Sequence, residues 1–263
     1  INKLEVYRDS DRREDNDRFD FMKRAYKFAV ENRALGLGVL GWHSLLQSKM
    51  LPFDHIDSMK LNTEIFKLIK ERSYQASEAM AKEYGEPKVL EGYGRRNTTT
   101  MAVAPTTSSA FILGQVSQGI EPIWSNCYVK DVAKLKVTIK NPILENLLEE
   151  KGFNTREVWQ SIRDYDGSVQ HLDILEQEEK EVFKTFAEVN QMNIIQQAAA
   201  RQRYIDQGQS LNIMIHPDTP VKDINKIYVE AWKLGIKALY YQHSMNAAQQ
   251  FNRELLACDS CEA

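Results

Sequence analysis

Apolar side chains recur at the spacing of a helix face along much of the chain, and this pattern predicts most of its secondary structure. Helices are expected from near residue 18 and at about 58–84, 142–151, 155–162, 177–206 and 221–234. Short apolar or alternating runs predict strands at 101–104, 134–140, 211–215 and 236–241. Residues 1–20 are instead dominated by charge, which predicts a solvated segment that leads into the first helix.

The order of the last three elements predicts how their strands pair. A strand at 211–215, a helix at 221–234 and a strand at 236–241 follow one another. Such a connection brings the two strands together in parallel and is nearly always right-handed. We therefore expect a mixed α/β fold.

Composition narrows the class of protein. The 263 residues are 43% hydrophobic and carry a net charge of -3 without a long basic stripe, so we expect a globular protein that does not bind nucleic acid. No apolar run is long enough to span a bilayer, and three cysteines suit a reducing compartment, so we expect a cytoplasmic protein without a membrane partner. Because the chain begins with Ile1 and not with Met, we interpret it as a split, processed or trimmed part of a longer protein.

A cluster of hydroxyl side chains follows the predicted strand at 101–104. Pro105 ends that strand because it lacks a backbone donor, and Thr107, Ser108 or Ser109 is expected to cap a helix. The free amides of a helix N-terminus favour an anion such as phosphate, and the neighbouring hydroxyls add neutral donors. An ordinary helix cap without a ligand fits the same residues, and this stretch alone does not decide between the two.

Gly36, Gly38 and Gly41 stand at the spacing G-x-G-x-x-G of a dinucleotide-binding loop. In that loop, the glycines lie between a strand and a helix, where the backbone approaches a pyrophosphate. Here the preceding segment has a helical pattern. We therefore favour the alternative that these glycines allow a buried helix to pack closely against its neighbours.

Two features near the C-terminus suggest redox chemistry. Tyr240 and Tyr241 are adjacent, and neighbouring phenols can pass an oxidising equivalent, although consecutive aromatics in a strand are more often core residues. Cys258 and Cys261 form a Cys-x-x-Cys pair, which favours a dithiol that carries two electrons over the alternative of half a zinc site. Cys127 is expected to be a buried thiol.

Four separated motifs together resemble one enzyme family. They are the runs 96–109, 119–122 and 206–212 with 239–241, and the terminal cysteines. In this order they resemble the C-terminal part of the large (alpha) subunit of class I ribonucleoside-diphosphate reductase. The resemblance implies the second half of a ten-stranded α/β barrel at 1–104, a phosphate-binding loop with a C-terminal α/β domain at 105–241, and a mobile redox tail at 242–263.

The resemblance also implies roles for individual residues. The loop that binds the diphosphate of the ribonucleotide substrate matches Pro105, Thr106, Thr107, Ser108 and Ser109. A stacked phenol pair that relays a radical to an active-site cysteine matches Tyr240 and Tyr241. A pair of tail cysteines that re-reduces the active-site disulfide, and is itself reduced by thioredoxin or glutaredoxin, matches Cys258 and Cys261.

The sequence departs from the family in its cysteines. The family's radical cysteine lies in an Asn-x-Cys-x-Glu motif, and neither this motif nor the two reducible active-site cysteines are present here. We therefore expect the chain to be inactive without an N-terminal portion of the large subunit that carries them. We further expect a metal-containing small subunit to supply the radical, and this chain itself to bind no cofactor or metal. The alternative is a non-catalytic phosphate-binding α/β module with a redox or zinc-binding cysteine pair.

Overall fold

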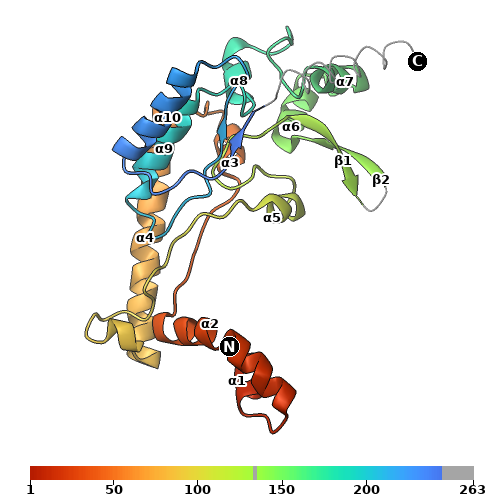
Figure 1. The fold of residues 1–263 in the computed structure, drawn as a ribbon. Helices are drawn as coiled ribbons and strands as arrows, with labels where there is room; N and C mark the ends of the chain where they lie inside the picture. Colours follow the sequence, from red (N-terminus) through yellow and green to blue (C-terminus); the bar gives the residue numbers. More distant parts are fainter. Residues whose placement is uncertain (133–134, 245–263) are drawn as a thin grey trace. The chain divides into compact units, whose positions relative to one another are not determined.

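The computed structural model describes residues 1–132 and 135–244, and the chain divides into two compact units (Figure 1). Unit 1 comprises Ile1–Leu37, Ile65–Ala102 and Tyr204–Gln207. Unit 2 comprises Gly38–Glu64, Val103–Arg203 and the described residues from Gly208 onwards. The long helix α4 (Ile56–Tyr84) begins in unit 2 and ends in unit 1.

Unit 1 begins with two helices, α1 (Asn2–Arg8) and α2 (Arg13–Asn32), that pack against each other. Tyr26 on α2 donates a hydrogen bond to Glu5 (2.9 Å) and accepts one from Arg8 (3.2 Å). Residues 1–20 are mostly exposed, as expected of a solvated segment, but they are largely helical, so the prediction that the first helix begins near residue 18 is wrong. The short 3₁₀ helix η1 (Lys88–Leu90) also packs against α2.

Two extended segments of unit 1 run in parallel after α2. Leu37 and Met101 form a parallel bridge, in which Leu37 N donates to the Thr100 carbonyl (2.7 Å) and Ala102 N donates to the Leu37 carbonyl (3.1 Å). A Cβ added to Gly36 would lie 3.0 Å from the Cβ of Ala102. The close packing expected of this glycine is present, but it joins extended segments, so the predicted buried helix is wrong.

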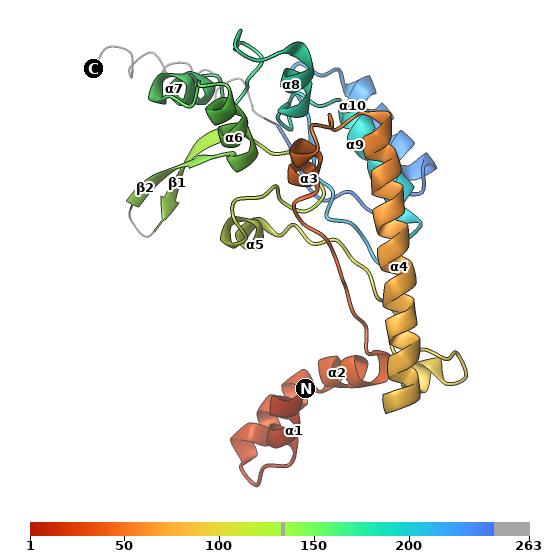
Figure 2. The same ribbon diagram turned by 180° about the vertical axis from the view of Figure 1, so that it is seen from behind.

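Unit 2 contains most of the secondary structure. Its antiparallel hairpin joins β1 (Cys127–Val132) to β2 (Leu135–Lys140), with Cys127 opposite Lys140. Besides the start of α4, its helices are α3 (Trp42–Ser48), α5 (Thr107–Ile112), α6 (Pro142–Glu150), α7 (Arg156–Asp164), α8 (Gln177–Val182), α9 (Gln191–Gln202) and α10 (Val221–Lys233). Helices α9 and α10 lie side by side, and the hairpin lies beside α7 (Figures 1 and 2).

One apolar cluster of unit 2 joins the hairpin to helices α6, α7 and α8. Its buried members are Cys127, Leu144, Leu148, Trp159, Ile162, Val169, Leu172, Leu175, Val182 and Phe183. Side-chain caps start two of these helices where the sequence pattern expects them, since Asn141 accepts from Ile143 N and Thr155 accepts from Val158 N. The cluster therefore fixes the hairpin on its helical support.

The long helix predicted at 177–206 is divided into α8 and α9. Phe183 and Phe186 lie between the two helices and are fully buried, and Asn190 caps α9 by accepting from Met192 N (2.9 Å). Thr185 N donates to Glu188 in the same turn (2.7 Å). Helical periodicity missed this turn because its aromatic residues fall on the same apolar face as those of the helices.

Strands β3 (Ile213–Met214) and β4 (Gln242–His243) pair in parallel and flank α10 in the chain. The predicted parallel pairing is therefore confirmed. The second strand does not lie at 236–241, because the chain first turns back at the end of α10, where Gly235 has φ 79° and Ile236 N donates to the Ala231 carbonyl.

The predicted strand at 101–104 consists of isolated bridges, and Val103 of unit 2 forms one of them with Gln209. Among the described residues, no helix combines the length and the apolar character needed to cross a bilayer.

Candidate functional site

The hydroxyl-rich loop leads into α5, but its cap differs from the prediction. Thr106 occupies the N-cap with φ 55°, and its side chain does not cap the helix. Its Oγ1 instead accepts a hydrogen bond from Gly119 N (2.8 Å), which ties the loop to the next turn. The prediction that Thr107, Ser108 or Ser109 caps the helix is therefore wrong.

The same loop is open to solvent at the positions expected to bind an anion. Pro105, Thr107, Ser108 and Ser109 are exposed, and Thr106 is partly exposed. The first amides of a helix have no partner within the helix, so those of α5 remain available to a ligand at this end. The loop is thus exposed, and its binding of a phosphate group stays a prediction.

The glycine motif before α3 offers no comparable site. Gly41 N and Trp42 N donate to the carbonyls of Ser117 (2.8 Å) and Gly119 (3.2 Å), and Ser44 N donates to Ser117 Oγ (3.1 Å). The amides that would hold a pyrophosphate at the start of α3 are therefore used within the protein. This geometry agrees with the packing role that the sequence favoured for the glycines.

Tyr240 and Tyr241 lie together at the surface of unit 2. Their ring centroids are 4.0 Å apart with an interplanar angle of 48°, and the residues are 48% and 57% exposed. The more frequent role expected from sequence, that of core residues, is wrong. The hydrogen bond to Tyr241, together with the charge that Tyr241 would carry, raises the pKa of Tyr240, so the two phenols act on each other directly.

Sequence reasoning missed two aromatic residues that continue from this pair. The His243 ring lies 6.0 Å from the Tyr241 ring and 4.6 Å from the Trp124 ring, and the Trp124 ring lies 5.1 Å from Phe186. Strand alternation was the available signal for His243, because residues two apart share a face. Burial lowers the pKa of His243, which favours a neutral imidazole.

A cavity of about 840 Å³ in unit 2 adjoins this row of rings. Trp124 and His243 line it, together with residues of the hairpin and of α7 such as Tyr128 and Arg163. Cys127 also lines the cavity and is buried, and burial raises the pKa of its thiol. The prediction of a buried thiol is confirmed.

Two further sequence predictions concern the tail cysteines and metal binding. Cys258 and Cys261 lie outside the described residues, so their roles stay predictions. Within residues 1–132 and 135–244, no group of three or more His, Cys, Asp or Glu side chains is placed to hold a metal ion.

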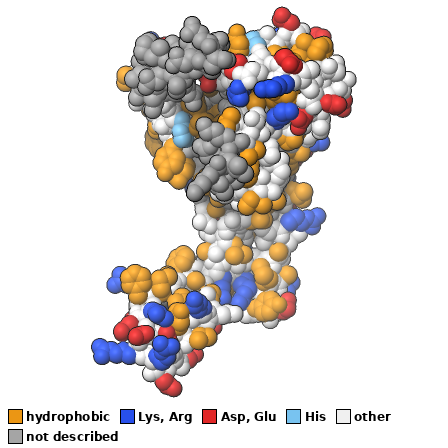
Figure 3. Space-filling view, turned by 90° about the vertical axis from the view of Figure 1, so that its right-hand side faces the viewer, with side chains coloured by type: hydrophobic (Ala, Val, Ile, Leu, Met, Phe, Trp, Pro, Cys, Tyr) orange, Lys and Arg blue, Asp and Glu red, His pale blue; other side chains and the backbone are white. Residues whose placement is uncertain are grey.

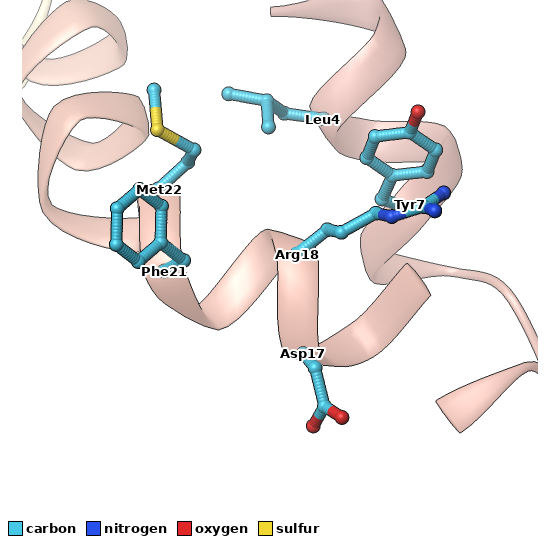
Figure 4. A pocket seen from close by; sticks show the side chains of 6 residues that line it. All are labelled: Leu4, Tyr7, Asp17, Arg18, Phe21 and Met22. Carbon is cyan, nitrogen blue, oxygen red and sulfur yellow. The ribbon is translucent and has the colours of Figure 1, made fainter. Parts of the chain in front are cut away.

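Unit 1 has a separate, open hollow of about 400 Å³ on its first two helices (Figure 4). Arg18 lies over the ring of Tyr7, 5.7 Å from its centroid, and Phe21 is largely exposed nearby. Hydrophobic side chains on the surface of this unit are interspersed with charged ones (Figure 3). The hollow contains none of the residues predicted to carry chemistry.

Parallel extended segments connected by helices place the chain in the α/β class, with the hydroxyl loop directly after one such segment. Residues 18–91 and 88–242 match the family model described as the barrel domain of ribonucleotide reductase. The chain therefore belongs to this family, and the expected α/β barrel class is confirmed.

Individual relatives agree with this assignment. The chain is 39% identical over 232 residues to the ribonucleoside-diphosphate reductase large subunit of Invertebrate iridescent virus 6, covering 86% of this chain and 24% of the relative. It is 40% identical over 226 residues to that of Invertebrate iridescent virus 3, covering 85% and 36%. The solved alpha subunit of the Actinobacillus ureae class Id ribonucleotide reductase matches with a TM-score of 0.82 and 53% identity, covering 94% of this chain and 44% of that one.

The chain thus spans less than half of the length of these relatives and corresponds to a portion of a large subunit. The alternative of an unrelated phosphate-binding module is not favoured. The number of barrel strands, the tail and the boundaries at 104 and 241 stay predictions.

Proposed function

We propose that this chain supplies three functions of a ribonucleoside-diphosphate reductase large subunit. It holds the substrate diphosphate, passes a radical through Tyr240 and Tyr241, and returns reducing equivalents through Cys258 and Cys261. The observation that carries the proposal is the contact between two surface phenols in a chain of this family. Phenols in contact at a surface suit transfer between subunits better than they suit packing.

The tyrosine pair can move an electron and a proton together. When one phenol has lost an electron and its hydroxyl proton, its neighbour transfers a hydrogen atom's equivalent, so that the first phenol is restored and the second becomes the radical. The hydrogen bond between the two hydroxyls provides the path for the proton. The centroid distance of 4.0 Å keeps the electron path short.

The hydroxyl loop is proposed to bind the diphosphate with neutral donors. Thr107, Ser108 and Ser109 are exposed and form the first turn of α5, whose first amides have no partner within the helix. Neutral donors hold a phosphate without a fixed positive charge, and they allow nucleotides to exchange during turnover.

The remaining parts of the reaction are assigned to partners. The radical cysteine and the reducible cysteine pair come from an N-terminal portion of the large subunit, and the radical comes from a metal-containing small subunit. Thioredoxin or glutaredoxin reduces Cys258 and Cys261. Such a complex would act in the cytoplasm, where these reductants are found.

Phenylalanine substitutions in the assembled complex test the radical relay. Tyr240→Phe and Tyr241→Phe keep the ring but remove the hydroxyl, so each is expected to lower turnover at least about 100-fold with little change in substrate binding. Tyr165→Phe is the matched control, because this exposed ring stacks on His171 at 3.9 Å outside the pair. Full turnover in either pair variant would refute the relay.

Serine substitutions test the tail cysteines separately. Cys258→Ser and Cys261→Ser are expected to abolish multiple turnovers with thioredoxin but to leave a single turnover of the pre-reduced complex intact. Stoichiometric zinc that both substitutions remove would favour a structural metal site and contradict the dithiol role.

A further inference from the structure

Asn212 holds the backbone of the tyrosine pair in place. Its Oδ1 accepts a hydrogen bond from Tyr241 N (3.1 Å). On either side, the Leu211 carbonyl accepts from Tyr240 N (2.8 Å) and the Tyr241 carbonyl accepts from Ile213 N (3.0 Å). The backbone N of Tyr241 therefore donates to a side chain, whereas the neighbouring donors, Tyr240 N and Ile213 N, donate to backbone carbonyls.

Glu121 in turn fixes Asn212 from both ends. Its two carboxylate oxygens accept from Asn212 N (2.6 Å) and from Asn212 Nδ2 (3.1 Å). Because the amide nitrogen of Asn212 is bound to Glu121, the amide oxygen is directed to Tyr241. The orientation of the Asn212 side chain is therefore determined by its partners.

Removing the Glu121 carboxylate from water is unfavourable, and only 4% of the residue's surface is exposed. Burial raises its pKa, while the two bonds from Asn212 and the charge of Arg201 oppose that rise. Arg201 is itself fully buried and bonds to Gln209 (2.7 Å) and Asn62 (2.8 Å). A carboxylate in such surroundings needs its donors, so the bonds to Asn212 are strongly favoured.

The same short segment also contacts the hydroxyl loop. Gly119, two residues before Glu121, donates to Thr106 Oγ1 (2.8 Å). A Cβ on Gly119 would lie 3.2 Å from the Ala104 carbonyl oxygen, so the backbone segments approach closely. Loop and tyrosine pair are therefore both anchored to residues 119–121.

We propose that Glu121 and Asn212 are positioning residues for the radical relay, which orient Tyr241 against Tyr240 through the chain of hydrogen bonds from carboxylate to amide to backbone. Neither side chain reacts. The inference rests on the proposed function for its consequence in catalysis, but the effect on the tyrosine pair is measurable without it.

A polarity swap tests this hydrogen-bond chain. In Glu121→Gln the new amide faces the amide nitrogen of Asn212, and in Asn212→Asp two carboxylates face each other. In the double variant Glu121→Gln/Asn212→Asp, the glutamine oxygen accepts from the backbone of residue 212, the glutamine nitrogen donates to the new carboxylate, and the other carboxylate oxygen still accepts from Tyr241 N. Every bond is retained, only the one between the two side chains has its direction reversed, and the net charge of the pair is unchanged.

The first measurement follows the pair itself. The full 263-residue chain carries 3-fluorotyrosine at position 240, and its phenol is titrated by ¹⁹F NMR. Each single variant is expected to lower this pKa by weakening the hydrogen bond to Tyr241, even though the charge added by Asn212→Asp would by itself raise it, and the double variant is expected to restore it. Asn154→Asp is the control, because Asn154, like Asn212, donates to a glutamate, Glu149 (2.9 Å), and accepts from an N–H group, Trp159 Nε1 (2.7 Å).

The second measurement uses the assembled reductase. The single variants are expected to lower kcat about 10- to 100-fold with an unchanged KM, and the swap is expected to recover it, because misplacement affects transfer and not binding.

The two measurements separate the possible failures. Single variants that leave the fluorotyrosine titration unchanged would overturn the positioning role, whatever the turnover. Shifts of opposite sign in the two single variants would also overturn it, since the charge that Glu121→Gln removes and Asn212→Asp adds, and not the bond pattern, would then control the pair. A native complex without turnover would contradict the proposed function but would leave the NMR result decisive for the inference.

Discussion

Asp206 of unit 1 joins three separate stretches of chain through one carboxylate. One oxygen accepts from Thr100 N (2.7 Å), Met101 N (3.0 Å) and Thr100 Oγ1 (3.0 Å). The other accepts from Tyr74 OH (2.9 Å) and forms an ion pair with Lys70. The side chains of Asp206 and Lys70 are only 12% and 19% exposed, so water replaces little of this bonding if one partner is lost.

We predict that Asp206→Asn destabilises unit 1 by about 3 kcal/mol. The amide oxygen still serves the backbone donors, but the amide nitrogen then faces the ammonium of Lys70. Breaking a buried ion pair costs about 3 to 5 kcal/mol, and partial exposure places this pair near the lower end. Because about 1.4 kcal/mol corresponds to a factor of ten, exchange of the Thr100 and Met101 amides should accelerate roughly 100-fold.

Hydrogen exchange with mass spectrometry and urea unfolding of the full chain measure this loss. The matched control is Asp57→Asn, because Asp57 pairs with Lys60 on the exposed surface of the same helix α4 (2.8 Å). This surface pair is expected to contribute about 0.5 kcal/mol or less. Equal effects of the two substitutions, within that margin, would refute the reasoning about the buried pair.

The pH dependence gives the same prediction a second check. Burial alone raises the pKa of Asp206, but the bonds from Lys70, Thr100, Tyr74 and Met101 outweigh it, so the pKa lies far below the ordinary 3.8. The stabilisation is then complete above that ordinary value and is lost only as the pH falls towards the lower folded-state pKa. The difference between native and Asp206→Asn protein should therefore be constant near neutrality and shrink below about pH 4.

Three other predictions concern unit 2. Burial lowers the pKa of His43 from 6.5 to about 4, so between these pH values the protein binds a proton when it unfolds. Its stability therefore rises with pH over this range by up to about 3 kcal/mol, and His43→Gln should abolish this rise in urea titrations. Gly167→Ala should cost about 3 kcal/mol, because its Cβ would lie 1.9 Å from a serine hydroxyl, whereas Gly235→Ala, with positive φ but open space, should cost about 1 kcal/mol in the same assay. Thr106→Val should cost about 1 kcal/mol, because Gly119 N loses its acceptor, and a change below about 0.3 kcal/mol would contradict that role.

Local pattern predicted those elements whose stability is local. The helices at 142–151, 155–162 and 221–234 were predicted because an apolar stripe, a cap or a terminating glycine lies within each segment. The parallel pairing of β3 with β4 followed from the order of elements alone. The turn at 183–190 was missed because its aromatic residues continue the apolar face of the helices, and the helix α1 was missed because its contacts are with α2 and lie outside its own sequence.

In the candidate site too, the local sequence predicted some features and missed others. Residue types located the hydroxyl loop and the tyrosine pair, but periodicity treated the tyrosines as apolar and therefore predicted them in the core. Their exposure follows from the return of the chain after α10, which no local pattern encodes. Glu121 and Asn212 were equally hidden, because 91 residues separate the two partners of their hydrogen bonds.

The position of Cys127 bears on where the relay can end. This thiol is buried in the cluster of α6, α7 and α8, and burial raises its pKa, so it is a poor partner for a surface phenol. Tyr240 and Tyr241, in contrast, are exposed, and the backbone N of Tyr241 donates to Asn212. Under the proposed function, the thiol that accepts the oxidising equivalent from this pair therefore comes from a partner segment and not from Cys127.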